Sequence, residues 1–248
     1  MASDDAISSF AQDGVAIIRS IVRPDQLSAL SEDIAKVRVE GITGEDSFCN
    51  WPSLDSFRDV ALASSVPEHA ADFLDSFQIR LHYDRIVGGS NDQRQRWVQD
   101  QPFAAVDSRS ITAWVVVDNI AKGDSSEFWA GSHLGSWYVH EGAIDVDQMP
   151  EGQTVLPMPD LVADESSYDI RRWSLEPGDV LYTSSLTVHS IPESFAQHRA
   201  VALNYVDAKA ILVDRPWSTV PDHSELLKST EPGSPLDDER FPIAWPQG

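Results

Sequence analysis

Cysteine, basic residues and long apolar runs are all scarce in this chain of 248 residues. Cys49 is the only cysteine, so neither an intrachain disulfide nor a cysteine-rich metal site can form. We expect Cys49 to be a small, buried, apolar side chain. No apolar segment approaches the roughly 20 residues that a membrane-spanning helix needs.

The first residues also lack a targeting pattern. The stretch Met1-Ala2-Ser3-Asp4-Asp5 is acidic, whereas a secretory signal peptide begins with basic residues followed by an apolar segment. With no apolar run long enough to cross a bilayer, the sequence predicts a cytoplasmic protein without a membrane partner.

Basic side chains are outnumbered: 18 Lys and Arg stand against 40 Asp and Glu, which gives a formal charge of -22. A field of this sign repels nucleic acid and anionic membrane surfaces, so both are excluded as partners. The apolar content of 42% and the aromatic content of 9% are those of a globular protein. The partner that remains is a small organic molecule, and the oligomeric state is left open.

Helical patterns dominate the first third of the chain, and β-type patterns dominate the rest. Helices are expected near 4–12, 24–37, 53–63 and 66–75, with a short strand at 14–18 and a loop at 41–52. From Phe77 onward, apolar and polar residues alternate in short runs that predict strands. These runs are 77–87, 109–118, 127–130, 170–175, 179–183, 187–189 and 200–207.

Helices followed by many short strands predict an α+β protein. We expect an antiparallel barrel or jelly roll with the N-terminal helices packed against one sheet, and one domain spanning 1–248. The segment 134–168 has no clear period and is too long for a passive connection, so it is a candidate lid or substrate loop. Phe241–Trp245 is apolar enough to dock on the body of the domain.

Three polar residues fall where predicted strands begin or end. Asp100 precedes a strand, His189 ends one, and Arg199 begins the next. A barrel brings such strand ends together at its mouth. A carboxylate and an imidazole there could bind a divalent metal, and the planar donors of an arginine could bind a dicarboxylate. A phosphate-binding glycine loop and a Gly-x-Ser-x-Gly nucleophile elbow are both missing from the sequence.

The order of the motifs resembles the phytanoyl-CoA dioxygenase family of iron(II)/2-oxoglutarate oxygenases over most of the chain. The segments that carry the resemblance are Phe10–Arg19, Trp97–Pro102 (a Trp-His-Gln-Asp motif in the family), Thr112–Asp118, Ala130–His133 (Pro-Gly-Ser-His in the family) and Leu175–Val180. The resemblance implies a double-stranded β-helix, of the jelly-roll or cupin-like kind, with Fe(II) and 2-oxoglutarate as cofactors.

The resemblance also assigns roles to single residues. It makes Asp100 and His189 two of the three iron ligands, pairs Arg199 with the far carboxylate of 2-oxoglutarate, and places Trp114 near that co-substrate. The departure from the family is Val98, which stands at the first histidine ligand. An isopropyl group has no lone pair, and three protein ligands are what holds iron(II) with positions open for co-substrate and O₂.

Several groups could replace the missing ligand. His82 could reach the site from a neighbouring strand, and His133 or His140 could reach it from the 134–168 segment. Alternatively, Asp100, His189 and 2-oxoglutarate could hold iron weakly without a third protein ligand.

Two functions follow. The first is a non-haem iron(II)/2-oxoglutarate-dependent oxygenase of the hydroxylase type acting on a small organic molecule. The second is a family member that has lost oxidative metal catalysis through Val98. It would then act as a metal-independent isomerase or cyclase, or as a binding protein.

Overall fold

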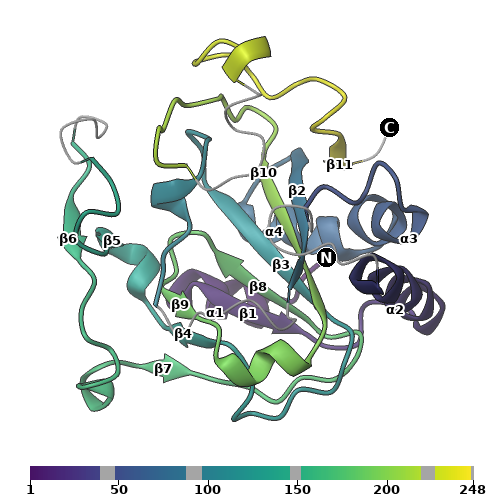
Figure 1. The fold of residues 1–248 in the computed structure, drawn as a ribbon, viewed down its shortest axis with the longest axis horizontal. Coiled ribbons are helices and arrows are strands. Elements are labelled where there is room, and N and C mark those ends of the chain that lie inside the picture. Colours follow the sequence, from purple (N-terminus) through teal and green to yellow (C-terminus); the bar gives the residue numbers. More distant parts are fainter. Residues whose placement is uncertain (40–47, 88–96, 146–151, 219–226, 247–248) are drawn as a thin grey trace.

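The computed structural model describes residues 1–39, 48–87, 97–145, 152–218 and 227–246. In these ranges the N-terminal part is helical and the remainder is built largely from short strands, in the order that the sequence predicts (Figure 1). The helices are α1 (Asp4–Asp13), α2 (Pro24–Val39), α3 (Asp55–Arg58, continued by a π turn at Asp59–Ala63) and α4 (Val66–Leu74).

Two antiparallel sheets form the body of the molecule. The larger has the order β1 (Val15–Ile18), β8 (Val180–Ser184), β3 (Ser110–Val116), β10 (Ala200–Asp207), β2 (Ile79–Val87) and β11 (Ile243–Trp245). The smaller has the order β7 (Ile170–Arg171), β4 (Glu127–Trp129) and β9 (His189–Ser190). Neighbours that are distant in sequence, such as β2 and β10, show that the chain crosses over repeatedly.

The two faces of the large sheet have different neighbours. On one face, Val201 and Leu203 of β10 pack with α1, α2 and α4 in the largest apolar cluster. On the other face, Ala200 and Ala202 join Phe128 of the smaller sheet in a second cluster. The alternation of β10 thus directs successive residues to the helices and to the space between the sheets. Helices covering one sheet and a curled antiparallel architecture agree with the expected α+β class.

The segment 134–168 is more regular than its sequence suggests. Its described residues include β5 (Trp137–Val139) and β6 (Val155–Pro157), which pair in parallel. The pair lies on the opposite side of the molecule from α2 and α3 (Figure 1). Tyr138 packs with Trp129, with ring centroids 5.0 Å apart. The expectation that this segment closes over a substrate stays a prediction, and residues 146–151 lie outside the described ranges.

The expected burial of Cys49 is wrong, because its side chain is exposed. Its backbone N–H donates to the carbonyl of Asp84, and its φ of 54° is in the left-handed region. The buried neighbour is instead Asn50, whose amide donates to the Asp84 carboxylate over 2.8 Å. Backbone anchoring of the loop therefore turns the thiol outward. Among the described residues, no helix combines the length and apolar character that crossing a membrane would require.

Candidate functional site

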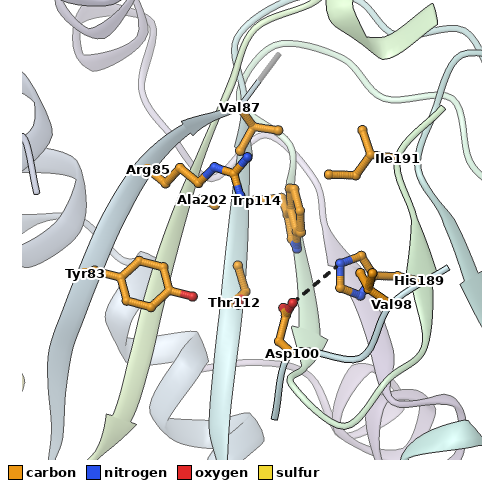
Figure 2. Close-up of a pocket in the computed structure, with 10 residues that line it drawn as sticks. All are labelled: Tyr83, Arg85, Val87, Val98, Asp100, Thr112, Trp114, His189, Ile191 and Ala202. Carbon is orange, nitrogen blue, oxygen red and sulfur yellow. Dashed lines mark ion pairs between the residues drawn. The ribbon is translucent and has the colours of Figure 1, made fainter. Parts of the chain in front are cut away.

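A small pocket lies between the two sheets and contains most of the residues singled out in the sequence (Figure 2). Its cavity has a volume of about 90 Å³. Its lining comes from β2, β3, β10, β9 with the residue that follows it, and the segment before the Gln101–Phe103 turn. The lining residues are Tyr83, Arg85, Val87, Val98, Asp100, Thr112, Trp114, His189, Ile191 and Ala202.

Backbone pairing brings the two halves of the predicted motif together. The N–H of Val98 donates to the carbonyl of His189 over 2.8 Å, and the N–H of His189 donates back to Val98 over 2.9 Å. This antiparallel bridge places the Val98 side chain beside the imidazole. Asp100 lies two residues further on, and its Oδ1 is 3.9 Å from Nε2 of His189 (Figure 2). The structure thus unites Val98, Asp100 and His189 at one corner of the pocket.

The imidazole of His189 has a fixed orientation. Its Nδ1 lies 3.1 Å from the carbonyl oxygen of Thr187, which can only accept, so Nδ1 carries the donated hydrogen. The ring packs edge-on against Trp114, with centroids 5.8 Å apart, and stacks on Phe128 at 6.1 Å. In the neutral ring the lone pair is therefore on Nε2, the atom that faces Asp100 and the pocket. Such an atom can accept a proton or bind a metal.

The turn after Asp100 is held from the C-terminal part of the chain. The buried guanidinium of Arg215 donates to the carbonyls of Gln101 and Ala104. Trp217 donates through Nε1 to the carbonyl of Pro102 over 2.9 Å. Burial lowers the pKa of Arg215, and the ring of Trp137 lies 5.0 Å from its guanidinium carbon. This clamp positions Asp100, and its distance along the chain left no local signal in the sequence.

The donor set does not fit a three-ligand iron site. Asp100 and His189 supply two ligand atoms, while the corner beside His189 that would supply the third is filled by the isopropyl group of Val98. Within the described ranges, no group of three or more His, Cys, Asp or Glu side chains is arranged to hold a metal ion. Two protein ligands leave iron(II) without the facial set that retains it.

The three histidines considered as replacements have other contacts. Nδ1 of His82 lies 3.1 Å from the side-chain oxygen of Asn204. Nε2 of His133 faces the carbonyl of Ala11 at 3.2 Å. His140 comes nearest to the motif, since its Nε2 donates to the carbonyl of Trp97 over 2.8 Å. His82, His133 and His140 all lie outside the pocket lining.

The structure places only one of the two residues that the resemblance assigned to 2-oxoglutarate, Trp114 and Arg199, in the pocket lining. Trp114 lines the pocket, and its Nε1 donates to Thr183 over 3.0 Å. Arg199 is outside the lining and binds the carboxylate of Asp118 through Nη2 at 2.6 Å and Nε at 2.9 Å. Its Nη1 donates to Ser31 of α2 over 2.7 Å. The structure thus directs Arg199 toward the helices, and this placement does not favour the expected contact with 2-oxoglutarate.

The basic residue that does line the pocket is Arg85, on β2. Its guanidinium carbon lies 5.3 Å from the ring centroid of Phe48. Tyr83, on the same strand, directs its hydroxyl toward Asp100 and Thr112 (Figure 2). Burial, with a smaller contribution from the charge of Asp100, raises the pKa of Tyr83 well above its usual value. The phenol therefore keeps its proton and remains a hydrogen-bond donor.

Comparison of the sequence with known proteins finds no matching family model and no matching curated protein. Comparison of the structure does find similar folds. SnoK, a non-heme alpha-ketoglutarate-dependent carbocyclase from nogalamycin biosynthesis, is 18% identical with a TM-score of 0.74, over 98% of this chain and 96% of SnoK. The epimerase SnoN from the same biosynthesis is 17% identical with a TM-score of 0.73, over 97% of each chain.

EctD from S. alaskensis, with bound Fe, is 16% identical with a TM-score of 0.65, over 88% of this chain and 81% of EctD. SnoN is also known with Fe³⁺, alpha-ketoglutarate and nogalamycin RO, and EctD with 2-oxoglutarate and 5-hydroxyectoine. At these identities the likeness establishes the fold alone. The chain has the fold of non-heme 2-oxoglutarate-dependent enzymes, while the phytanoyl-CoA dioxygenase family remains a prediction.

Proposed function

We propose that this chain is a redox-neutral enzyme acting on a small organic molecule, with Asp100 and His189 as a proton-transfer pair and without catalytic iron. The observation that carries the proposal is Val98, whose side chain fills the corner beside His189 where a third metal ligand would lie. We interpret the two facing sheets as a double-stranded β-helix, which forms one domain over 1–248.

The geometry of the pair suits proton transfer. Nε2 of His189 and Oδ1 of Asp100 are 3.9 Å apart, which is too long for a direct hydrogen bond. Both side chains line the same pocket, so a substrate bound there can contact the two atoms together (Figure 2). Nε2 would remove a proton from a carbon of the substrate and return it to another position, so that no electrons are lost or gained overall. The Asp100 carboxylate would stabilise the imidazolium formed in between.

Enzymes of this fold with solved structures include a carbocyclase and an epimerase. Rearrangement of a carbon skeleton or of a stereocentre is therefore compatible with the fold. In those proteins the chemistry is described as alpha-ketoglutarate-dependent. The present chain would have kept the pocket together with Asp100 and His189, and it would have Val98 in place of the third iron ligand.

The decisive experiment is anaerobic Fe(II) binding, measured by equilibrium dialysis with and without 2-oxoglutarate, on the natural protein and on Val98→His. We expect the variant to bind iron at least about 10- to 100-fold more tightly, since even loss of an outer-shell partner changes affinity by that factor. Ile191→His is the matched control, because it places a histidine in the same pocket away from the motif and should gain nothing.

The proton-transfer role is tested by incorporation of deuterium from D₂O into the carbon positions of small oxo-acids, followed by NMR in the presence of EDTA. His189→Gln should slow the exchange about 10²- to 10⁴-fold, the usual contribution of a general base. Exchange that is faster than the protein-free rate and equal in the natural protein and in His189→Gln would refute the proposed pair.

An iron(II)/2-oxoglutarate oxygenase remains the second candidate, favoured by the retained Asp100 and His189. Fe(II) and 2-oxoglutarate are the cofactors that it would need, and His140 is the histidine bonded nearest to the motif. Iron-dependent conversion of 2-oxoglutarate to succinate by the natural protein would establish this candidate and overturn the redox-neutral proposal.

A further inference from the structure

The wall of the pocket formed by β2 and β3 presents hydrogen-bond donors. Arg85, Tyr83 and Thr112 lie on this wall, opposite Asp100 and His189 (Figure 2). The arrangement follows from strand register. Arg85 and Trp114 flank Ala202 of β10, and Tyr83 and Thr112 flank Asn204 in the next row on this face. Flanking strands are about 9–10 Å apart, a gap that the long Arg85 and Tyr83 side chains can reach across.

A β-bulge in β2 turns these two side chains inward. Asn204 lies opposite Tyr83 and Tyr205 lies opposite Leu81, so His82 has no residue opposite it on β10. Residues two apart on a regular strand share a face, yet Leu81 packs in the helix-side cluster while Tyr83 lines the pocket. The extra residue changes the alternation and places both Tyr83 and Arg85 in the cavity.

The hydrogen bonds around Asn204 give the Thr112 hydroxyl a direction. The side-chain oxygen of Asn204 can only accept, so His82 donates to it through Nδ1 over 3.1 Å. Nδ2 of Asn204 then donates to Oγ1 of Thr112, also over 3.1 Å. Because that oxygen already accepts, its own hydrogen is available for an acceptor in the pocket. His82 and Asn204 are therefore positioning residues for Thr112.

The chemical class of the ligand follows from the charge and the hydrogen-bond donors of this wall. The Arg85 guanidinium is a cation, the Tyr83 phenol keeps its proton, and Thr112 can donate, so the wall matches oxygen atoms that carry negative charge. The remaining lining, which includes Val87, Trp114 and Ile191, is apolar. The cavity of about 90 Å³ is smaller than the roughly 150 Å³ in which an engineered cavity holds benzene. The enclosed part of the ligand is therefore a short chain.

We propose that the pocket binds a small organic carboxylate, with the carboxylate on Arg85, Tyr83 and Thr112 and the adjacent carbon directed at Asp100 and His189. The carboxylate site stands on the donor wall alone. The placement of the carbon rests on the proposed proton-transfer function. In a protein with a formal charge of -22, a local cation is what makes binding of an anion favourable.

The test uses pyruvate, 2-oxoglutarate and the neutral analogue pyruvamide, titrated by calorimetry or ligand-observed NMR in EDTA. The carboxylates should bind at least about 10-fold more tightly than pyruvamide, and Arg85→Gln should weaken them about 10- to 100-fold. Tyr83→Phe should weaken them by less, about 3- to 10-fold. Arg58→Gln removes the same charge from an exposed position on helix α3 and should leave binding unchanged.

Equal binding of acid and amide, or unchanged binding by Arg85→Gln, would refute the carboxylate site. Thermal melting of each variant separates a binding defect from unfolding, and Tyr83→Phe serves where Arg85→Gln does not fold. Carboxylate binding that requires Fe(II) would overturn both this site and the redox-neutral function. Failure of all three compounds beside iron binding gained by Val98→His would overturn the site and leave the redox-neutral function standing.

Discussion

At the scale of single residues, the two arginines near the pocket show how strand direction decides a role. Arg199 directly precedes Ala200, whose side chain faces the space between the sheets. Alternation directs Arg199 to the other side, where it binds Asp118 and Ser31. Arg85 occupies the pocket instead. We therefore assign Arg199 to stability and Arg85 to ligand binding.

This assignment predicts the behaviour of Arg199→Gln. The side chains of Arg199 and Asp118 are 29% and 25% exposed, so the pair lies between a surface and a buried ion pair. Its loss should lower the free energy of unfolding by about 1–3 kcal/mol in urea titrations, with carboxylate binding unchanged. Arg58→Gln, which breaks an exposed pair with Asp55, should change stability by less than about 0.5 kcal/mol.

The same pair gives a pH dependence with a defined sign. The Arg199 guanidinium holds the pKa of the Asp118 carboxyl below its usual value. Its contribution to stability is therefore present above the pKa of the unfolded carboxyl and is lost as the pH falls through the lowered, folded-state pKa. The stability difference between the natural protein and Arg199→Gln should shrink over that acidic range. A loss of carboxylate binding in Arg199→Gln, with Arg85→Gln unaffected, would reverse the two assignments.

The sequence pointed to several of the residues that line the pocket but not to all of them, and their roles in binding stay predictions. Val98, Asp100, Trp114 and His189 meet in one pocket because their motifs follow one another in an order that a barrel folds together. Tyr83 and Arg85 were not foreseen as site residues. They lie in an alternating strand, but the bulge at His82 changes which residues face inward, and a bulge has no reliable sequence signal.

At the scale of elements, the junction between α1 and β1 shows how tightly the helices are joined to the site-bearing strands. Gly14 ends α1 with a φ of 75°, and its carbonyl accepts a hydrogen bond from Thr187 over 2.8 Å. Thr187 in turn supplies the carbonyl that orients His189. The helix end, the threonine and the pocket imidazole are thus connected by successive contacts.

We expect Gly14→Ala to destabilise the protein much more than Gly131→Ala. Both glycines have positive φ, at 75° and 80°, so each substitution carries the strain of about 1–2 kcal/mol for a left-handed residue. A Cβ at Gly14 would also lie 2.5 Å from Nδ1 of His133, whereas at Gly131 its nearest atom is 3.9 Å away. Urea titration measures the difference, and equal losses would show that the junction relaxes without cost.

The positions of helices and strands were more predictable from the sequence than the pairing of the strands. The recurrence of Leu30 and Ile34 predicted α2, and both side chains are fully buried in it. The β-type runs from Phe77 onward became strands, although 170–175 is reduced to Ile170–Arg171. Pairing partners such as β2 and β10 could not be derived, since they depend on contacts between residues far apart in sequence. The strands within 134–168 are short and were missed for the same reason.

At the scale of the whole molecule, the formal charge of -22 acts against folding. A compact chain brings its excess carboxylates closer together than an unfolded one does, so their mutual repulsion favours unfolding. Salt reduces this repulsion, because the screening length falls from about 30 Å at 0.01 M to about 10 Å at 0.1 M. We therefore expect the melting temperature at neutral pH to rise as NaCl increases over this range.

The pI of about 4.4 provides the control for this prediction. Near that pH the net charge is close to zero, so screening has no net repulsion to relieve and the rise with NaCl should vanish. The slope of melting temperature against NaCl concentration, compared at the two pH values, separates screening from any general effect of salt on apolar burial. Equal slopes at both pH values would mean that the acidic surface is already relieved locally, by pairs such as Asp118 and Arg199.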